Sequence, residues 1–139
     1  MAGKNTFRLK VITPRGVKLD EQAEMVIMRT TTGDLGVLHG HRPLSAALDH
    51  GIMRVTLKDG ESRVLGAFGG IVNVDESSVT VFAGFAQWPD EVDLPEATAE
   101  RDQCLKRLEE NQSPAQTQQN KSLLRQALVR IELCEYREE

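Results

Sequence analysis

The chain has 139 residues, of which 40% are hydrophobic, 27% charged and only 4% aromatic, a composition typical of a soluble globular protein. Its formal net charge of −4 provides no general attraction to nucleic acid or to anionic lipid, so neither is expected as a direct partner. No apolar run approaches the roughly 20 residues that a membrane-spanning helix needs, and the polar start Met1–Asn5 does not resemble a signal peptide. We expect a cytosolic protein that can still be bound to a membrane complex.

The first part of the chain, up to about Trp88, has the pattern of β-strands. Apolar and polar residues alternate over 7–11, 53–58 and 78–81, as a strand with one buried face requires. Turn signals separate these runs, among them the Asp-Gly pair within 58–61. Many short strands at close spacing predict a sandwich or a barrel.

After Trp88 the pattern becomes helical. Asp93, Pro95 and Glu96 predict the start of a helix with a capping box, which we expect to end near Glu110. A break is expected at Asn111 and Gln112. These features predict two antiparallel helices.

The second helix is predicted to start at Ser113, with Pro114 at its first position and Gln116 as the partner of a capping box. The apolar residues expected on one face of this helix are Leu124, Ala127, Leu128, Ile131 and Cys134. This stripe is thin, so we expect a marginally stable hairpin that must lean on the β-domain or on another protein.

No residue pattern indicates catalysis or a metal site. His39, His41 and His50 lack cysteine or carboxylate partners at ligand spacing, and a loop that contacts a partner is the better interpretation of the first two. Cys104 and Cys134 would be offset by roughly 20 Å along the hairpin, which excludes a disulfide and makes both small core residues. The glycine-rich segments lack the Gly-Lys-Ser/Thr of a phosphate loop.

The ordered set of motifs resembles the epsilon subunit of F-type ATP synthases over nearly the whole chain. The most specific segment is 33–44, GDLGVLHGHRPL, supported by 7–14, by 51–55, by 69–74 and by the position of the hairpin. The resemblance implies an N-terminal β-sandwich of about ten strands and a C-terminal antiparallel two-helix hairpin. Residues 1–88 would couple the rotor, and residues 89–139 would regulate it.

The resemblance also implies partners. It predicts a non-catalytic central-stalk subunit that binds the gamma subunit and the ring of c subunits, attached peripherally to the cytoplasmic face of a bacterial cell membrane. Asp34 and His41 fall in the segment that resembles the c-ring contact; otherwise they would be a turn acid and a loop-ordering residue. The coupling ion, proton or sodium, is left open.

In bacterial relatives the hairpin can fold onto the sandwich or extend into the alpha/beta hexamer, where it restrains ATP hydrolysis. Here Lys121, Arg125 and Arg130 are the candidate contacts with the catalytic subunits; for any single one, a solvated helix face is the alternative. Whether the hairpin is folded or extended is left open.

Some relatives bind ATP through an aliphatic-Asp-x-x-Arg-Ala motif. Here the motif is degenerate at Asp93, Glu96 and Ala97, with an acid where phosphate would need a base. We expect no cofactor and weak or absent ATP binding. Two competing interpretations are a β-domain that binds a small ligand alone and an enzyme with an unrecognised site.

Overall fold

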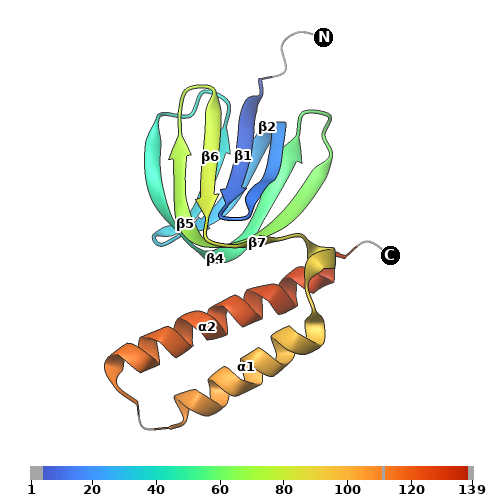
Figure 1. Ribbon diagram of the computed structural model, residues 1–139. Helices are drawn as coiled ribbons and strands as arrows, with labels where there is room; N and C mark the ends of the chain where they lie inside the picture. Colours follow the sequence, from blue (N-terminus) through green and yellow to red (C-terminus); the bar gives the residue numbers. More distant parts are fainter. Residues whose placement is uncertain (1–4, 111, 138–139) are drawn as a thin grey trace. The chain divides into compact units, whose positions relative to one another are not determined.

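The computed structural model describes residues 5–110 and 112–137 and forms two compact units, Met1–Gln87 and Trp88–Glu139 (Figure 1). The first unit is all β and the second contains the two long helices, so the predicted order of a β-part followed by a helical hairpin is confirmed. The predicted break at Asn111 and the start of the chain up to Lys4 lie outside the described residues.

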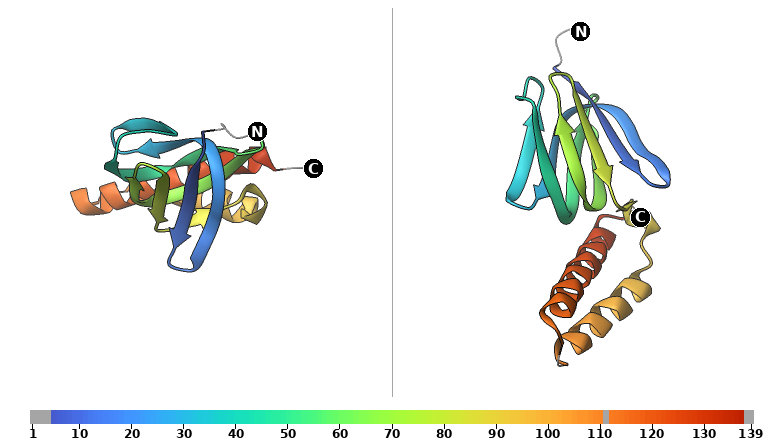
Figure 2. Two further views of the ribbon diagram at one scale, coloured as in Figure 1. Left: turned by 90° about the horizontal axis from the view of Figure 1, so that it is seen from above. Right: turned by 60° about the vertical axis from the view of Figure 1, so that its left-hand side comes forward.

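The first unit is a seven-stranded sheet that closes on itself. Its strands are β1 (Phe7–Thr13), β2 (Gly16–Thr30), β3 (Gly33–Leu38), β4 (Leu44–Leu57), β5 (Ser62–Val74), β6 (Ser78–Ala83) and β7 (Ala86–Gln87). The hydrogen-bonded order is β1-β6-β5-β4-β2-β3, and β1 also pairs with β2, which closes a barrel-like sandwich (Figures 1 and 2). Strand β3 pairs with β2 alone, and β7 pairs with β5.

The expected number of about ten strands is not confirmed, because the described residues form seven. Strands β2, β4 and β5 have 15, 14 and 13 residues, and they bend without ending. Irregularities in the pairing of β2 with β4, and left-handed glycines at Gly69 and Gly70 in β5, provide bends of this kind. A bent strand can contribute to both layers of the sandwich. It is then counted as one strand, which lowers the total below ten.

The core of this unit consists of the inward residues of alternating strands. Each predicted alternation is present: Leu9 and Val11 are fully buried in β1, as are Val79 and Val81 in β6. Aliphatic and methionine side chains fill most of the interior, as the low aromatic content requires. The other fully buried large side chains here are Val26, Met28, Val37, Met53, Val55, Leu65 and Val72.

The second unit begins with the short 3-10 turn η1 (Pro89–Glu91) and continues as two antiparallel helices. Helix α1 spans Leu94–Leu108, α2 spans Pro114–Leu133, and the 3-10 turn η2 (Cys134–Tyr136) follows directly. The Ser113–Gln116 capping box is present at the start of α2, with both reciprocal hydrogen bonds formed.

The capping box predicted for α1 is only half formed. The amide of Glu96 donates to the Asp93 carboxylate over 3.1 Å, but the Glu96 carboxylate accepts from Arg130 of α2. The competing guanidinium is cationic, so it attracts the Glu96 carboxylate more strongly than the neutral backbone amide of Asp93 does.

Candidate functional site

An apolar row on the outer face of the β-unit was not predicted from the sequence. Strand register places five residues beside one another: Ala47 pairs with Ile71, Ile71 with Phe82, Phe82 with Ile12, and Ile12 with Val17. We call these five residues the apolar row. Val17 is 57% exposed, Ile71 53% and Phe82 46%. Contiguous exposed apolar surface marks an interaction site, whereas single exposed residues do not.

The next line of residues on this face is polar; its side chains are short over β4, β5 and β6, and it continues to Lys10 of β1, which pairs with Thr80. Strand register sets Ser45 beside Asn73 and Asn73 beside Thr80, and the Ser45 hydroxyl donates to the Asn73 side-chain oxygen over 2.6 Å. Short side chains beside the apolar row leave a surface on which a partner can pack closely. The sequence contains a sign of the apolar row. In Ile71-Val72 and Val81-Phe82 two apolar residues are adjacent, so in an alternating strand one of each pair must face outward.

The structure places Asp34 and His41 at opposite ends of β3 and does not bring them together. Asp34 is the second residue of β3, and His41 follows the end of that strand at Leu38. Four residues at about 3.3 Å each separate Asp34 from Leu38 by about 13 Å along the strand. The two candidates therefore do not form one cluster.

Each of these two residues has a local partner. Arg29, opposite Asp34 in the register of β2 and β3, donates to the Asp34 carboxylate over 3.3 Å. Nδ1 of His41 donates to the Arg42 carbonyl over 2.8 Å, which orders the loop between β3 and β4. Leu38, just before this loop, is 59% exposed. The loop-ordering alternative for His41 is thus present, and it leaves the loop accessible to a partner.

The three basic candidates of α2 differ in exposure. Lys121 and Arg125 are exposed and lie four residues apart, on one face of the helix. Arg130 is buried, and its guanidinium pairs with Glu100 over 2.8 Å and with Glu96 over 3.2 Å. Sequence periodicity gave no sign that this arginine faces α1.

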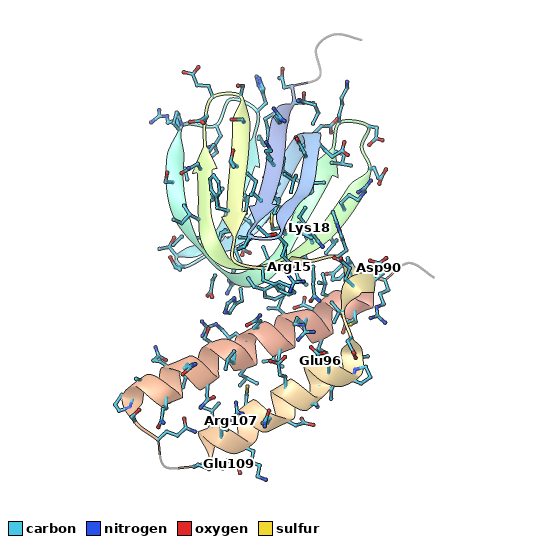
Figure 3. All side chains as sticks on the ribbon, in the orientation of Figure 1. Arg15, Lys18, Asp90, Glu96, Arg107 and Glu109 are labelled. Carbon is cyan, nitrogen blue, oxygen red and sulfur yellow. The ribbon has the colours of Figure 1, made fainter. Side chains whose placement is uncertain are left out.

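The segment Asp93 to Ala97 forms the start of α1 and contains no cation that could face phosphate. Ala97 is buried against the hairpin and Glu96 is occupied by Arg130. Figure 3 shows Glu96 in the first turn of α1. Weak or absent ATP binding remains a prediction.

Neither the histidines nor the cysteines form a reactive group in the part of the chain that the structure describes. No three His, Cys, Asp or Glu side chains among residues 5–110 and 112–137 are grouped so that they could hold a metal ion. Cys104 and Cys134 are both free thiols; the first is buried and the second half-buried. Burial raises the pKa of the Cys104 thiol, which makes it a poor nucleophile.

None of the helices within 5–110 and 112–137 is both long and apolar enough to cross a membrane.

Comparison with known proteins identifies the fold and the family. Residues 6–89 match the family model described as ATP synthase, Delta/Epsilon chain, beta-sandwich domain. The ATP synthase epsilon chain of Caldicellulosiruptor bescii is 30% identical over 133 residues, which cover 96% of each chain.

Two solved structures have a similar fold. A chain of the Euglena gracilis mitochondrial ATP synthase, in an OSCP/F1/c-ring assembly, gives a TM-score of 0.79 at 21% identity and covers 94% of this chain and 80% of its own. A chain of the Tetrahymena thermophila mitochondrial ATP synthase, in the central stalk and c-ring, gives 0.67 at 13% identity, with coverages of 92% and 96%.

The family model covers more than half of the chain, and the bacterial relative is matched over nearly its full length. The chain therefore belongs to the delta/epsilon chain family of ATP synthase, in which the epsilon chain is a non-catalytic subunit of the enzyme.

Proposed function

We propose that the chain is a central-stalk subunit that couples the ring of c subunits to the gamma subunit in an F-type, proton- or sodium-translocating ATP synthase. The observation that carries the proposal is the apolar row, which crosses the paired strands of β4, β5, β6, β1 and β2. A rotor subunit must transmit torque without slipping, and a contiguous apolar surface on a closed sheet suits a permanent contact. We assign this surface to the gamma subunit.

The loop that follows β3 is assigned to the c ring. Leu38 is exposed, and the hydrogen bond from His41 to the Arg42 carbonyl gives the loop a defined shape. Asp34 lies at the other end of β3, so the c-ring contact would have to extend along the strand to include it. The solved chains with a similar fold come from assemblies whose descriptions name a c-ring, which supports this assignment.

The hairpin is proposed as the regulatory part. In an extended state, Lys121 and Arg125 would contact acidic residues of the catalytic subunits in the alpha/beta hexamer and restrain ATP hydrolysis. Arg130 can join them only after it leaves Glu96 and Glu100. The assembled complex would hold the chain at the cytoplasmic face of a bacterial membrane.

The apolar row can be tested by placing a charge in it. Phe82→Asp and Ile71→Asp should each weaken binding of the full chain to the gamma subunit roughly tenfold or more, because a buried carboxylate would have no partner at the interface. Affinity measured by calorimetry or surface plasmon resonance gives the readout. Leu105→Asp is the matched control, since Leu105 of α1 is 46% exposed, as is Phe82.

Circular dichroism should show that all three variants keep the β-signal of the wild type. If the folded Phe82→Asp and Ile71→Asp variants bind the gamma subunit as tightly as the Leu105→Asp variant, the apolar row is not the coupling surface.

A further inference from the structure

The contact between α1 and α2 contains little apolar bulk. The buried residues of α1 are Ala97 and Cys104, and those of α2 are Ala127, Arg130 and Leu133. The larger side chains Leu105 and Leu128 are each 46% exposed. Apart from Leu133, the buried apolar side chains are small, and because hydrophobic stabilisation scales with the area buried, they provide only weak adhesion between the helices.

Arg130 supplies the directional contact that the apolar residues lack. Its Nη1 donates to Oε2 of Glu100 over 2.8 Å, and its Nη2 donates to Oε1 of Glu96 over 3.2 Å. Glu96 and Glu100 are four residues apart and so lie on one face of α1. The fork of the guanidinium can hold both carboxylates at once.

The positions of these charges along the helices add to the attraction. Glu96 lies in the first turn of α1, where backbone amides favour an anion, and Arg130 lies in the last turn of α2, where carbonyls favour a cation. Arg130 keeps only 7% of its surface exposed. Because the guanidinium is buried, losing these two carboxylates should cost more than losing a pair in which both side chains are exposed.

A second arginine fastens the same end of the hairpin. Nε of Arg137 donates to the Pro89 carbonyl over 3.0 Å, and its Nη2 donates to the Val92 carbonyl. These carbonyls belong to the segment that leads from the β-unit into α1. The residue after η2 is therefore tied to the residues just before α1.

The other end of the hairpin is held differently. A polar cleft of about 380 Å³ lies there, lined by side chains of both helices and of the turn. Arg107, Glu110 and Leu123 line it together with the side-chain amides of Gln112, Gln116, Gln119 and Asn120. Nδ2 of Asn120 donates to Oε1 of Gln112 over 2.8 Å. Figure 3 shows Arg107 at this turn end of α1, away from Glu96. A water-accessible gap contributes little adhesion, so at this end the helices depend mainly on the chain that joins them.

We propose that Arg130 and Arg137 form a clasp that holds the base of the hairpin closed, at the end where the chain itself does not join the two helices. The base is the end that contains the start of α1 and the end of α2. Opening of the whole hairpin then requires the exchange of the Arg130–Glu96–Glu100 contacts for other partners.

The clasp has a consequence for regulation, which rests on the proposed function. Arg130 becomes available to an acidic surface of another subunit only after Glu96 and Glu100 release it. The two carboxylates would therefore compete with that partner and set how easily the extended hairpin forms. The clasp itself is a property of the isolated chain and can be tested without the complex.

Hydrogen exchange on the isolated full chain tests where the clasp acts. In Arg130→Gln, amides of residues 97–101 and 127–133 should exchange roughly tenfold faster than in the wild type, whereas those of residues 104–108 and 117–124 should change less, because only the base loses its clasp. Exchange at the base that is unchanged in Arg130→Gln would overturn the proposal.

Thiol labelling tests which residues form the clasp. Cys104 is 2% exposed, so a thiol reagent reaches it only when the helices separate, and mass spectrometry distinguishes it from Cys134. Arg130→Gln should speed its labelling roughly tenfold to a hundredfold, and Glu100→Gln and Glu96→Gln should do so to a smaller extent. Arg101→Gln is the matched control, since the pair of Arg101 with Asp102 is confined to α1.

Circular dichroism separates a loosened hairpin from an unfolded one. Loss of helix in the Arg130→Gln variant but not in the Arg101→Gln variant would equally support the clasp. Cys104 labelling at the wild-type rate in Arg130→Gln and in both Glu variants would refute it. If the clasp is confirmed in the isolated chain but the hairpin does not restrain ATP hydrolysis in the complex, only the regulatory proposal is contradicted.

Discussion

Arg8 and Asp20 form a two-point ion pair on the surface of strands β1 and β2. Nε and Nη2 of Arg8 donate to the two carboxylate oxygens of Asp20 over 2.9 and 2.8 Å. The hydrogen bond from Arg8 holds the pKa of the Asp20 carboxyl below its usual value. Both side chains are largely in solvent, so the pair fixes geometry and contributes little to stability.

Removal of the Arg8 guanidinium should raise the pKa of Asp20 towards its ordinary value. Because the pKa of Asp20 is lower in the folded state than in the unfolded state, the stabilisation is present above the ordinary pKa of an aspartate. It is lost as the pH falls through the folded-state pKa. In Arg8→Gln this acid-dependent loss should disappear. An NMR titration of the Asp20 carboxyl carbon measures the shift.

Arg15→Gln provides the control for this titration, because Arg15 is exposed at the turn between the same two strands. It removes the same charge from the same ribbon without touching the carboxylate of Asp20. A pKa for Asp20 that is unchanged in Arg8→Gln would contradict the assignment of the shift to that hydrogen bond.

At the scale of one strand, β5 bends at two consecutive glycines. Gly69 has φ of 73° and Gly70 has φ of 123°, values that side chains other than glycine rarely adopt. A Cβ placed on Gly70 would lie 1.9 Å from the carbonyl oxygen of Phe82 in β6. The close approach of two backbones at this bend therefore requires glycine at position 70.

Gly70→Ala should destabilise the β-unit by about 2–4 kcal/mol, the sum of a strained φ and a backbone displaced from its partner strand. Gly36→Ala in β3 is the matched control. A Cβ there would have only ordinary contact with Ile27 at 3.9 Å, so a change within about 0.5 kcal/mol is expected. Urea denaturation measures both variants. Equal urea midpoints for Gly70→Ala and Gly36→Ala would show that the stability of the β-unit does not depend on glycine at position 70.

The two helices form an element whose stability depends on few contacts. Of the apolar stripe predicted for α2, Ala127 is buried, Leu128 is exposed and Leu124 and Ile131 are half-buried. Leu133, which was not part of the predicted stripe, is buried in addition. Arg130, also outside the stripe, pairs with Glu96 and Glu100 of α1, so the face towards α1 differs from the predicted one. The expectation of a weakly apolar hairpin agrees with these burial values, and the clasp explains how such a hairpin can still hold together.

For the whole molecule, the division after Gln87 offers a direct test of regulation. A chain that ends after Trp88 should still join the complex, because the apolar row and the loop after β3 remain. If the hairpin restrains hydrolysis, ATPase activity of the reconstituted complex should rise severalfold over that with the full chain.

Electrophoresis of the purified complex should show that the shortened chain is retained in equal amount. ATPase activity that does not rise while the shortened chain is retained would mean that the hairpin is not inhibitory in this protein.

Local patterns in the amino-acid sequence are enough to predict the class of each part of the fold. Period-two alternation around Leu9 and Val79 predicted buried strands, and Ser113, Pro114 and Gln116 predicted the start of α2, because both signals depend on near neighbours in the chain. The segment 33–44 was specific enough to indicate the family to which the chain belongs. The Asp-Gly turn at 59–60 lies between β4 and β5, as predicted.

How residues that are distant in the chain combine depends on the packing of the elements. The apolar row exists because strand register aligns Ile12, Ile71 and Phe82, which lie up to 70 positions apart in the sequence. The burial of Arg130 depends on how α2 is rotated about its axis relative to α1. Helical periodicity does not determine this rotation when both faces of a helix carry few large apolar residues. Long-range register and helix rotation are properties of packing, so local patterns predicted the elements but not these two surfaces.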